Sequence, residues 1–264
     1  MKSANNNDHR EGWHGWDDYA PFYDWENTQT LGRRDVPFWV NLSIRFEGPV
    51  LELGCGTGRL SLPIAKRVDR FVGIDRSASM LARLSKKFRR AGLSHRAEFI
   101  RGDIRVLPFQ KMFRFKLVMA PYGMLQSLLC DTDLSDTLNS VSEVVPSGGM
   151  FGIDLVPDLP RWQEYNRRVS LRGRGRRNNR ITLIETVRQD HERQLTIFDQ
   201  EFVERRGRQR ETYRFSLAFR TLSVREISRH LENAGFVVDT VLGDYRGKAW
   251  SPEADVWIIL ARRR

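Results

Sequence analysis

A glycine-rich stretch near residue 50 has residue types and a spacing that indicate ligand binding. Residues 50–60, VLELGCGTGRL, place three glycines at alternate positions directly after an apolar run that contains one acid, Glu52. Glycines at this spacing let a ligand approach the backbone closely and leave amide donors accessible. A dinucleotide fingerprint would have another glycine where Arg59 stands, and a nucleotide P-loop would end in Gly-Lys-Ser or Gly-Lys-Thr. The loop therefore favours neither of these two ligand classes.

Two further acids follow expected strands and indicate what the loop binds. Asp75 lies about twenty residues after the loop, where a carboxylate accepts both hydroxyls of a ribose. Asp103 and Ile104 supply an acceptor for an exocyclic amine beside an apolar wall. Glu52 adds a negative charge that disfavours a pyrophosphate and tolerates a cation. We therefore expect a nucleoside ligand that carries positive charge and no phosphate.

The elements that position these residues alternate along the chain from residue 49 onward. Ser77 is an expected helix cap, and the apolar residues behind it recur at helical spacing. We expect helices at 59–68, 77–92 and 133–145, and strands at 49–53, 71–75, 97–103, 115–121 and 149–156. Strands that alternate with helices predict right-handed crossovers and a parallel sheet covered on both faces. The core is therefore expected to be a doubly wound α/β fold.

The pattern changes after the fifth strand. Residues 161–180 are rich in arginine and nearly free of apolar side chains, so we expect an exposed, mobile connection there. Three strand-like runs follow at 181–190, 194–205 and 210–221. A helix at 223–235 and two final strands complete the chain. The expected segments are an N-terminal cap, an α/β core, an antiparallel β insertion and the rest of the core, at 1–47, 48–157, 158–221 and 222–264.

These motifs, in this order, resemble those of the class I S-adenosylmethionine-dependent methyltransferases. The family's first motif, E/D-x-G-x-G-x-G, corresponds to residues 52–58, and its acidic second motif to 73–75 followed by SASML. The adenine motif corresponds to 102–104, and the fourth region to VMAPYGMLQSL. The resemblance implies a Rossmann-like seven-stranded sheet that ends in an antiparallel hairpin, with S-adenosyl-L-methionine as cofactor. It implies cofactor contacts from Tyr23, Glu52, Gly54, Cys55, Gly56, Gly58, Asp75, Arg76, Met80, Asp103, Ile104 and Ala120.

The N-terminal segment adds a narrower likeness. DDYAPFYDW, residues 17–25, is similar to the Y-x-x-x-Y-D segment of small-molecule N- and O-methyltransferases. Relatives of that kind that modify amino sugars or glycine share an antiparallel insertion after the fifth strand. The likeness implies that Tyr19 and Tyr23 lie over the methionine end of the cofactor and help to close the site. The other aromatic residues here are expected to pack as a hydrophobic cap: Trp13, Trp16, Phe22 and Trp25.

Methyl transfer from a sulfonium is an in-line displacement that needs no nucleophile from the protein. The chain must position the acceptor, exclude water and, for a protonated acceptor, supply a base. Cys55 is therefore interpreted as a small loop residue. Tyr122 either orients the acceptor or forms a wall, and Asp154 is either a base or a support for the next loop. Met124 stands where some aminosugar-modifying relatives have a histidine.

Composition limits the remaining interpretations. The five histidines lack metal-ligand spacing, so no metal is expected, and no run is long enough to cross a membrane. Two cysteines without a metal-binding pair indicate the cytoplasm. The net charge of +11 is attributed to a solvated basic surface.

We therefore expect a methyltransferase acting on N or O of a small-molecule acceptor. One alternative is an RNA or tRNA methyltransferase. The other is a cofactor-binding protein without catalysis, in which the insertion makes a homodimer interface.

Overall fold

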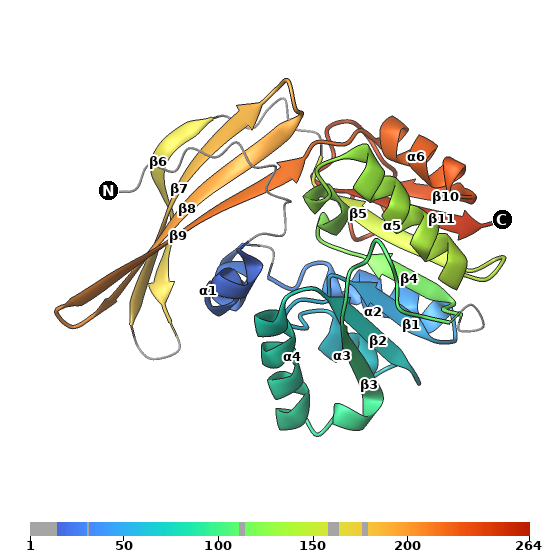
Figure 1. Ribbon diagram of the computed structural model, residues 1–264, viewed down its shortest axis with the longest axis horizontal. Coiled ribbons are helices and arrows are strands. Elements are labelled where there is room, and N and C mark those ends of the chain that lie inside the picture. Colours follow the sequence, from blue (N-terminus) through green and yellow to red (C-terminus); the bar gives the residue numbers. More distant parts are fainter. Residues whose placement is uncertain (1–14, 31, 111–113, 158–163, 176–178) are drawn as a thin grey trace.

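Two sheets and six α-helices build the described part of the chain (Figure 1). The structure is a computed structural model that describes residues 15–30, 32–110, 114–157, 164–175 and 179–264. Trp13, expected in the cap, lies outside the described residues. Within these ranges, no helix is long and apolar enough to cross a membrane.

The larger sheet has seven strands, as the motif resemblance implied, in the order β10-β11-β5-β4-β1-β2-β3. β11 pairs antiparallel with both β10 and β5, and the other neighbouring strands pair in parallel. The strands are β1 (Val50–Leu53), β2 (Phe71–Asp75), β3 (Ala97–Arg101), β4 (Leu117–Ala120), β5 (Met150–Leu155), β10 (Phe236–Leu242) and β11 (Trp257–Arg263). Each of β1, β4 and β5 is buried along its whole length, because helices cover both faces. The expected doubly wound α/β fold is confirmed.

Helices form one layer on each face of this sheet. Apolar residues of α2, α3 and α4 pack on one face, and those of α5 and α6 on the other. The bounds are α2 (Val36–Arg45), α3 (Ser61–Ala65), α4 (Ala78–Arg90), α5 (Asp131–Val144) and α6 (Val224–Asn233), with short 3₁₀ turns η1 (Ser94–Arg96) and η2 (Met124–Ser127). α3 is shorter than the helix expected at 59–68, because Arg59 and Leu60 lie in the turn that closes the glycine loop.

Local capping explains where the two most amphipathic helices begin. Ser77 is the N-cap of α4, and its Oγ accepts a hydrogen bond from the Met80 amide at 3.1 Å. Ser223 and Glu226 form a reciprocal capping box at the start of α6. Gly92 and Gly235, with φ of 68° and 84°, take the left-handed conformation just beyond the two helix ends.

The insertion forms a separate antiparallel sheet of four strands, in the order β6-β7-β8-β9. Its strands are β6 (Tyr165–Arg174), β7 (Arg180–Asp190), β8 (Leu195–Arg206) and β9 (Gln209–Arg220). The expected mobile connection at 161–180 is wrong for the part that forms β6. β6 is an edge strand, and several of its exposed positions carry arginines. The alternation of apolar and polar residues is therefore weak, and the segment is recognisable as a strand only from its pairing with β7.

Helix α1 (Trp16–Gln29) lies between this second sheet and α4 (Figure 1). Tyr19 and Phe22 pack on Leu183 and Phe202 of the second sheet, and Phe22 stacks on Phe202 with ring centroids 4.5 Å apart. Trp16 and Trp25 join the same apolar cluster. α1 therefore connects the insertion to the α/β core.

Candidate active site

The strand order reverses between β1 and β4, and the glycine loop leaves the carboxyl end of β1 at this point. In an open α/β sheet such a reversal creates a crevice that binds ligands. A cavity of about 400 Å³ lies there. Most of its lining comes from α1, the glycine loop, the ends of β2 and β3, and the segment after β4: Gly15, Trp16, Asp17, Asp18, Tyr23, Gly54, Gly56, Asp75, Arg76, Ser77, Met80, Arg101, Asp103, Ile104, Arg105, Pro121, Tyr122, Met124, Ser127, Leu128, Asp133 and Phe219.

Asp75 fixes the glycine loop against the start of α4. Its two carboxylate oxygens accept hydrogen bonds from the Gly56 amide at 2.7 Å and the Ser77 amide at 2.8 Å. Burial raises the pKa of Asp75, and the two amide bonds oppose that shift. Gly54 and Gly56, with φ of 62° and 52°, need the left-handed conformation that glycine adopts without strain. The loop and Asp75 therefore form one rigid wall of the cavity.

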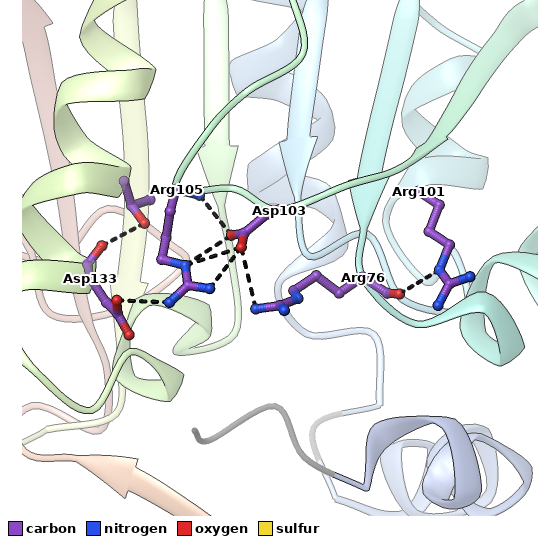
Figure 2. A network of polar contacts seen from close by, with 6 residues as sticks. Arg76, Arg101, Asp103, Arg105 and Asp133 are labelled. Atoms are coloured by element: carbon purple, nitrogen blue, oxygen red, sulfur yellow. Dashed lines mark hydrogen bonds and ion pairs between the residues drawn. The ribbon is translucent and has the colours of Figure 1, made fainter. Parts of the chain in front are cut away.

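Asp103 lies in a network of charges at the far end of the cavity (Figure 2). The Arg105 guanidinium donates to both Asp103 oxygens, with a shortest distance of 2.8 Å, and also contacts Asp133 at 2.9 Å. Arg76 lies 3.4 Å from Asp103, and its backbone oxygen accepts from Arg101. Burial would raise the pKa of Asp103, but the Arg105 bonds and the Arg76 charge outweigh it and lower the pKa. Both oxygens of the Asp103 carboxylate are therefore already engaged by arginine.

Helix α1 is held over the cavity by polar contacts that the sequence motifs did not indicate. Asp17 accepts hydrogen bonds from Ser77 Oγ at 2.5 Å and from the Ser79 amide at 3.1 Å. Asp24 accepts from Thr57 Oγ1 and from Lys87 Nζ, the latter at 2.8 Å. The two aspartates tie α1 to the glycine loop and to α4. The acidic character of residues 17–25 was the only sequence signal for these ties.

The segment after β4 places Tyr122 at the cavity in a strained conformation. Tyr122 and Gly123 have φ of 62° and 63°, a left-handed pair that is unusual for a tyrosine. The Gly123 amide donates to Asp154 Oδ1 at 2.9 Å, and the Tyr245 hydroxyl donates to Oδ2 at 2.7 Å. Burial raises the pKa of Asp154 to about 6, against these two bonds. Asp154 does not line the cavity, so it supports the Tyr122 loop and is placed less well for a base.

Arg59, which stands where a dinucleotide fingerprint would have a glycine, lies beneath Tyr122. Its guanidinium carbon is 5.2 Å from the Tyr122 ring centroid, and its Nη1 pairs with the buried Asp35. Arg59 places a positive charge under the ring that faces the cavity.

Nine of the predicted site residues line the cavity: Tyr23, Gly54, Gly56, Asp75, Arg76, Met80, Asp103, Ile104 and Tyr122. Six do not: Tyr19, Glu52, Cys55, Gly58, Ala120 and Asp154. The Tyr19 hydroxyl donates to Glu26, and its ring packs on Phe202 and Phe215 of the second sheet. Cys55 is buried, and burial keeps the pKa of its thiol far above neutral pH. Gly58 and Ala120 contribute close packing.

Glu52 differs most from its expected role as an anion beside the ligand. Its side chain is 3% exposed and accepts a hydrogen bond from Ser61 Oγ at 2.6 Å. Burial raises the pKa of Glu52 to about 8, although the Ser61 bond opposes the shift. The carboxyl is therefore mostly neutral at pH 7 in the ligand-free chain. The negative charge of the cavity comes from its lining, which has five aspartates and three arginines.

Comparison with known proteins shows what the cavity-forming part of the chain is similar to. Residues 50–149 match the family described as a methyltransferase domain. This segment of the chain is similar to methyltransferase domains. Over 134 residues the chain is 28% identical to a sterol 24-C-methyltransferase of Aspergillus fumigatus, a match that covers 50% of this chain and 33% of that enzyme. The resemblance to class I S-adenosylmethionine-dependent methyltransferases, inferred from the sequence motifs, is confirmed.

Solved structures extend the fold of the methyltransferase domain to nearly the whole chain. An S-adenosylmethionine-dependent methyltransferase from Clostridium acetobutylicum aligns with a TM-score of 0.79 and 17% identity, covering 93% of this chain and 98% of that one. A sugar N-methyltransferase from a Streptoalloteichus species aligns with a TM-score of 0.74 and 12% identity, covering 92% and 93%. Because the coverage reaches beyond residues 50–149, the insertion is part of the shared architecture.

Proposed function

We propose that this chain is an S-adenosylmethionine-dependent methyltransferase that transfers a methyl group to nitrogen or oxygen of a small-molecule acceptor. The observation that carries the proposal is the cavity of about 400 Å³ at the sheet reversal, walled by the glycine loop and Asp75 and covered by α1. Its acidic lining suits a sulfonium cofactor and an amine acceptor better than a phosphorylated ligand. The fold shared with a sugar N-methyltransferase supports the same choice.

The residues present fit this cofactor. Gly54 and Gly56 have no side chain to obstruct a ligand at the loop, and Asp75 is positioned beside them. Ile104 and Met80 supply an apolar wall near Asp103. When bound, the cofactor supplies an electrophilic methyl group.

The chain's own contribution is positioning and the exclusion of water. Trp16 and Tyr23 of α1 and Phe219 of β9 cover the cavity from the side of the insertion. Tyr122 faces the same space, and burial raises the pKa of both tyrosines, so their hydroxyls remain hydrogen-bond donors at neutral pH. Asp18 of α1 adds a further carboxylate to the lining, which favours an ammonium acceptor.

The test is a screen for S-adenosylhomocysteine release with amino sugars, amino acids and other small polar amines, run beside total RNA. Asp75→Asn serves as the cofactor-site control. Turnover of a small acceptor, strongly reduced in Asp75→Asn at limiting cofactor concentration, is the expected result. Methyl incorporation into RNA with no small acceptor would favour an RNA methyltransferase, and cofactor binding without any turnover would favour the non-catalytic alternative.

Three accompanying assignments stay predictions. They are a cytoplasmic location, a homodimer through the second sheet, and the division of the chain into segments at 1–47, 48–157, 158–221 and 222–264. The two cysteines, Cys55 and Cys130, are both free, which agrees with a reducing compartment.

A further inference from the structure

Four arginines form a row across the distal end of the second sheet. Arg174 of β6 is directly opposite Arg180 of β7, Arg180 is opposite Arg205 of β8, and Arg205 is opposite Arg210 of β9. Directly opposite residues in antiparallel strands project from the same face, with Cβ atoms about 4.5–5.5 Å apart. All four side chains are exposed. The row therefore crosses the whole width of the sheet on one face.

This face is the one that points away from α1. The alternate positions of the same strands carry Ile181, Phe202 and Leu217, which are buried against α1. In Figure 1 the turn between β8 and β9, next to the row, lies at the far left of the view, away from the seven-stranded sheet. Arg172, two residues before Arg174, adds another arginine to the same face. The row is thus a projecting surface, separate from the cavity.

Arginines elsewhere on this face have acidic partners. Glu201 accepts a salt bridge from Arg167 and lies 3.7 Å from Arg214. Arg188 pairs with Asp199 at 2.8 Å. In the part of the chain that the structure describes, Arg180, Arg205 and Arg210 have no carboxylate within ion-pair distance.

Like charges directly opposite each other destabilise a sheet. Arg180, Arg205 and Arg210 therefore face one another with no carboxylate to offset their charge in the described chain, and an anionic partner would relieve this repulsion.

We propose that this row binds a nucleic-acid strand through its phosphates. Arginine guanidinium groups match phosphate oxygens in bidentate geometry. Strands about 4.8 Å apart give the row a length of roughly 14 Å, so long, flexible arginine side chains can each contact a different phosphate along one extended strand. Every residue of the row is an arginine, whereas the buried centre of a protein–protein interface is typically apolar. Binding by this site is sequence-independent and does not depend on which acceptor the cavity methylates.

The test is fluorescence anisotropy with a labelled single-stranded RNA oligonucleotide over a series of salt concentrations, using the full chain. Four phosphate contacts predict a slope of log affinity against log salt of about −2.8, which is roughly a 50-fold loss over a fourfold rise in salt. Arg180→Gln/Arg205→Gln should reduce the slope to about −1.4. The matched control is Arg193→Gln/Arg225→Gln, which removes the same charge from two exposed arginines outside the row.

Thermal unfolding without RNA separates binding from folding. Removing two of the facing arginines relieves repulsion, so Arg180→Gln/Arg205→Gln should melt at the same or a higher temperature than the wild-type chain. RNA should raise the melting temperature of the wild-type chain and of the control, and raise that of the row variant less.

Three results would overturn the proposal. One is the absence of RNA binding by the wild-type chain at low salt. Another is an equal decrease of the salt-dependence slope in the control variant, because binding would then depend only on the net charge of the chain. The third is self-association of the wild-type chain that the row variant abolishes, because this would assign the face to a second copy. A DNA strand of the same sequence should bind equally, since no base or 2′-hydroxyl contact is proposed.

Discussion

Glu52 allows the electrostatics beneath the glycine loop to be measured. Burial raises the pKa of its carboxyl from 4.5 to about 8. Because the folded chain holds this proton more tightly than the unfolded chain, the group's contribution to stability is complete below pH 4.5 and is lost as the pH rises to about 8. Each pH unit in that window costs about 1.4 kcal/mol, so the whole loss is roughly 4–5 kcal/mol.

Glu52→Gln removes this titration and keeps an oxygen that accepts the Ser61 hydrogen bond. Urea unfolding of both proteins between pH 4.5 and 8 should show the wild-type chain losing stability relative to the variant by several kcal/mol. The slope of the unfolding free energy against urea concentration should be the same for the wild-type chain and for Glu52→Gln, because both expose the same surface on unfolding. Stability curves that run parallel across this window would refute a buried, neutral Glu52.

The same shift predicts proton release when the cofactor binds. A sulfonium cation near the loop favours the ionised carboxylate and lowers the pKa of Glu52. Calorimetry near neutral pH in two buffers of different ionisation enthalpy should therefore show release of up to about one proton by the wild-type chain and none by Glu52→Gln. Binding without any proton release in the wild-type chain would mean that the cofactor's charge does not reach Glu52.

The remaining predictions concern the cavity and its supports. Asp75→Asn should weaken cofactor binding in calorimetry by roughly 10- to 100-fold, the value of hydrogen bonds to a charged acceptor, and unchanged affinity would contradict its role at the ribose. Asp154→Ala leaves the Gly123 amide and the Tyr245 hydroxyl unpaired, so it should lower the free energy of unfolding in urea by about 2–5 kcal/mol. Asp154→Asn should keep most of the stability and most of kcat. A stable Asn variant that loses kcat would instead identify Asp154 as a base. Tyr122→Phe should lower kcat by about tenfold, the value of one hydrogen bond, with an unchanged cofactor Kd, and wild-type kcat would reduce Tyr122 to a wall.

Much of the α/β core could be predicted because its signals are local. The apolar run of β1, the Ser77 cap of α4 and the capping box of α6 each depend on residues close in sequence. Strand β6 could not be predicted in this way. Its exposed arginines hide the alternation, and only pairing with β7 makes the segment a strand.

The sequence by itself determined the glycine loop, Asp75 and Asp103 as cavity residues, because a parallel sheet brings the carboxyl ends of its strands together whatever the packing details. Only the tertiary structure decided the rest of the site. It placed α1 over the cavity through Asp17 and Asp24, which contact residues distant in sequence. It also made Glu52 a neutral buried group, since the charge of a carboxyl depends on how much water and which partners the folded chain leaves around it.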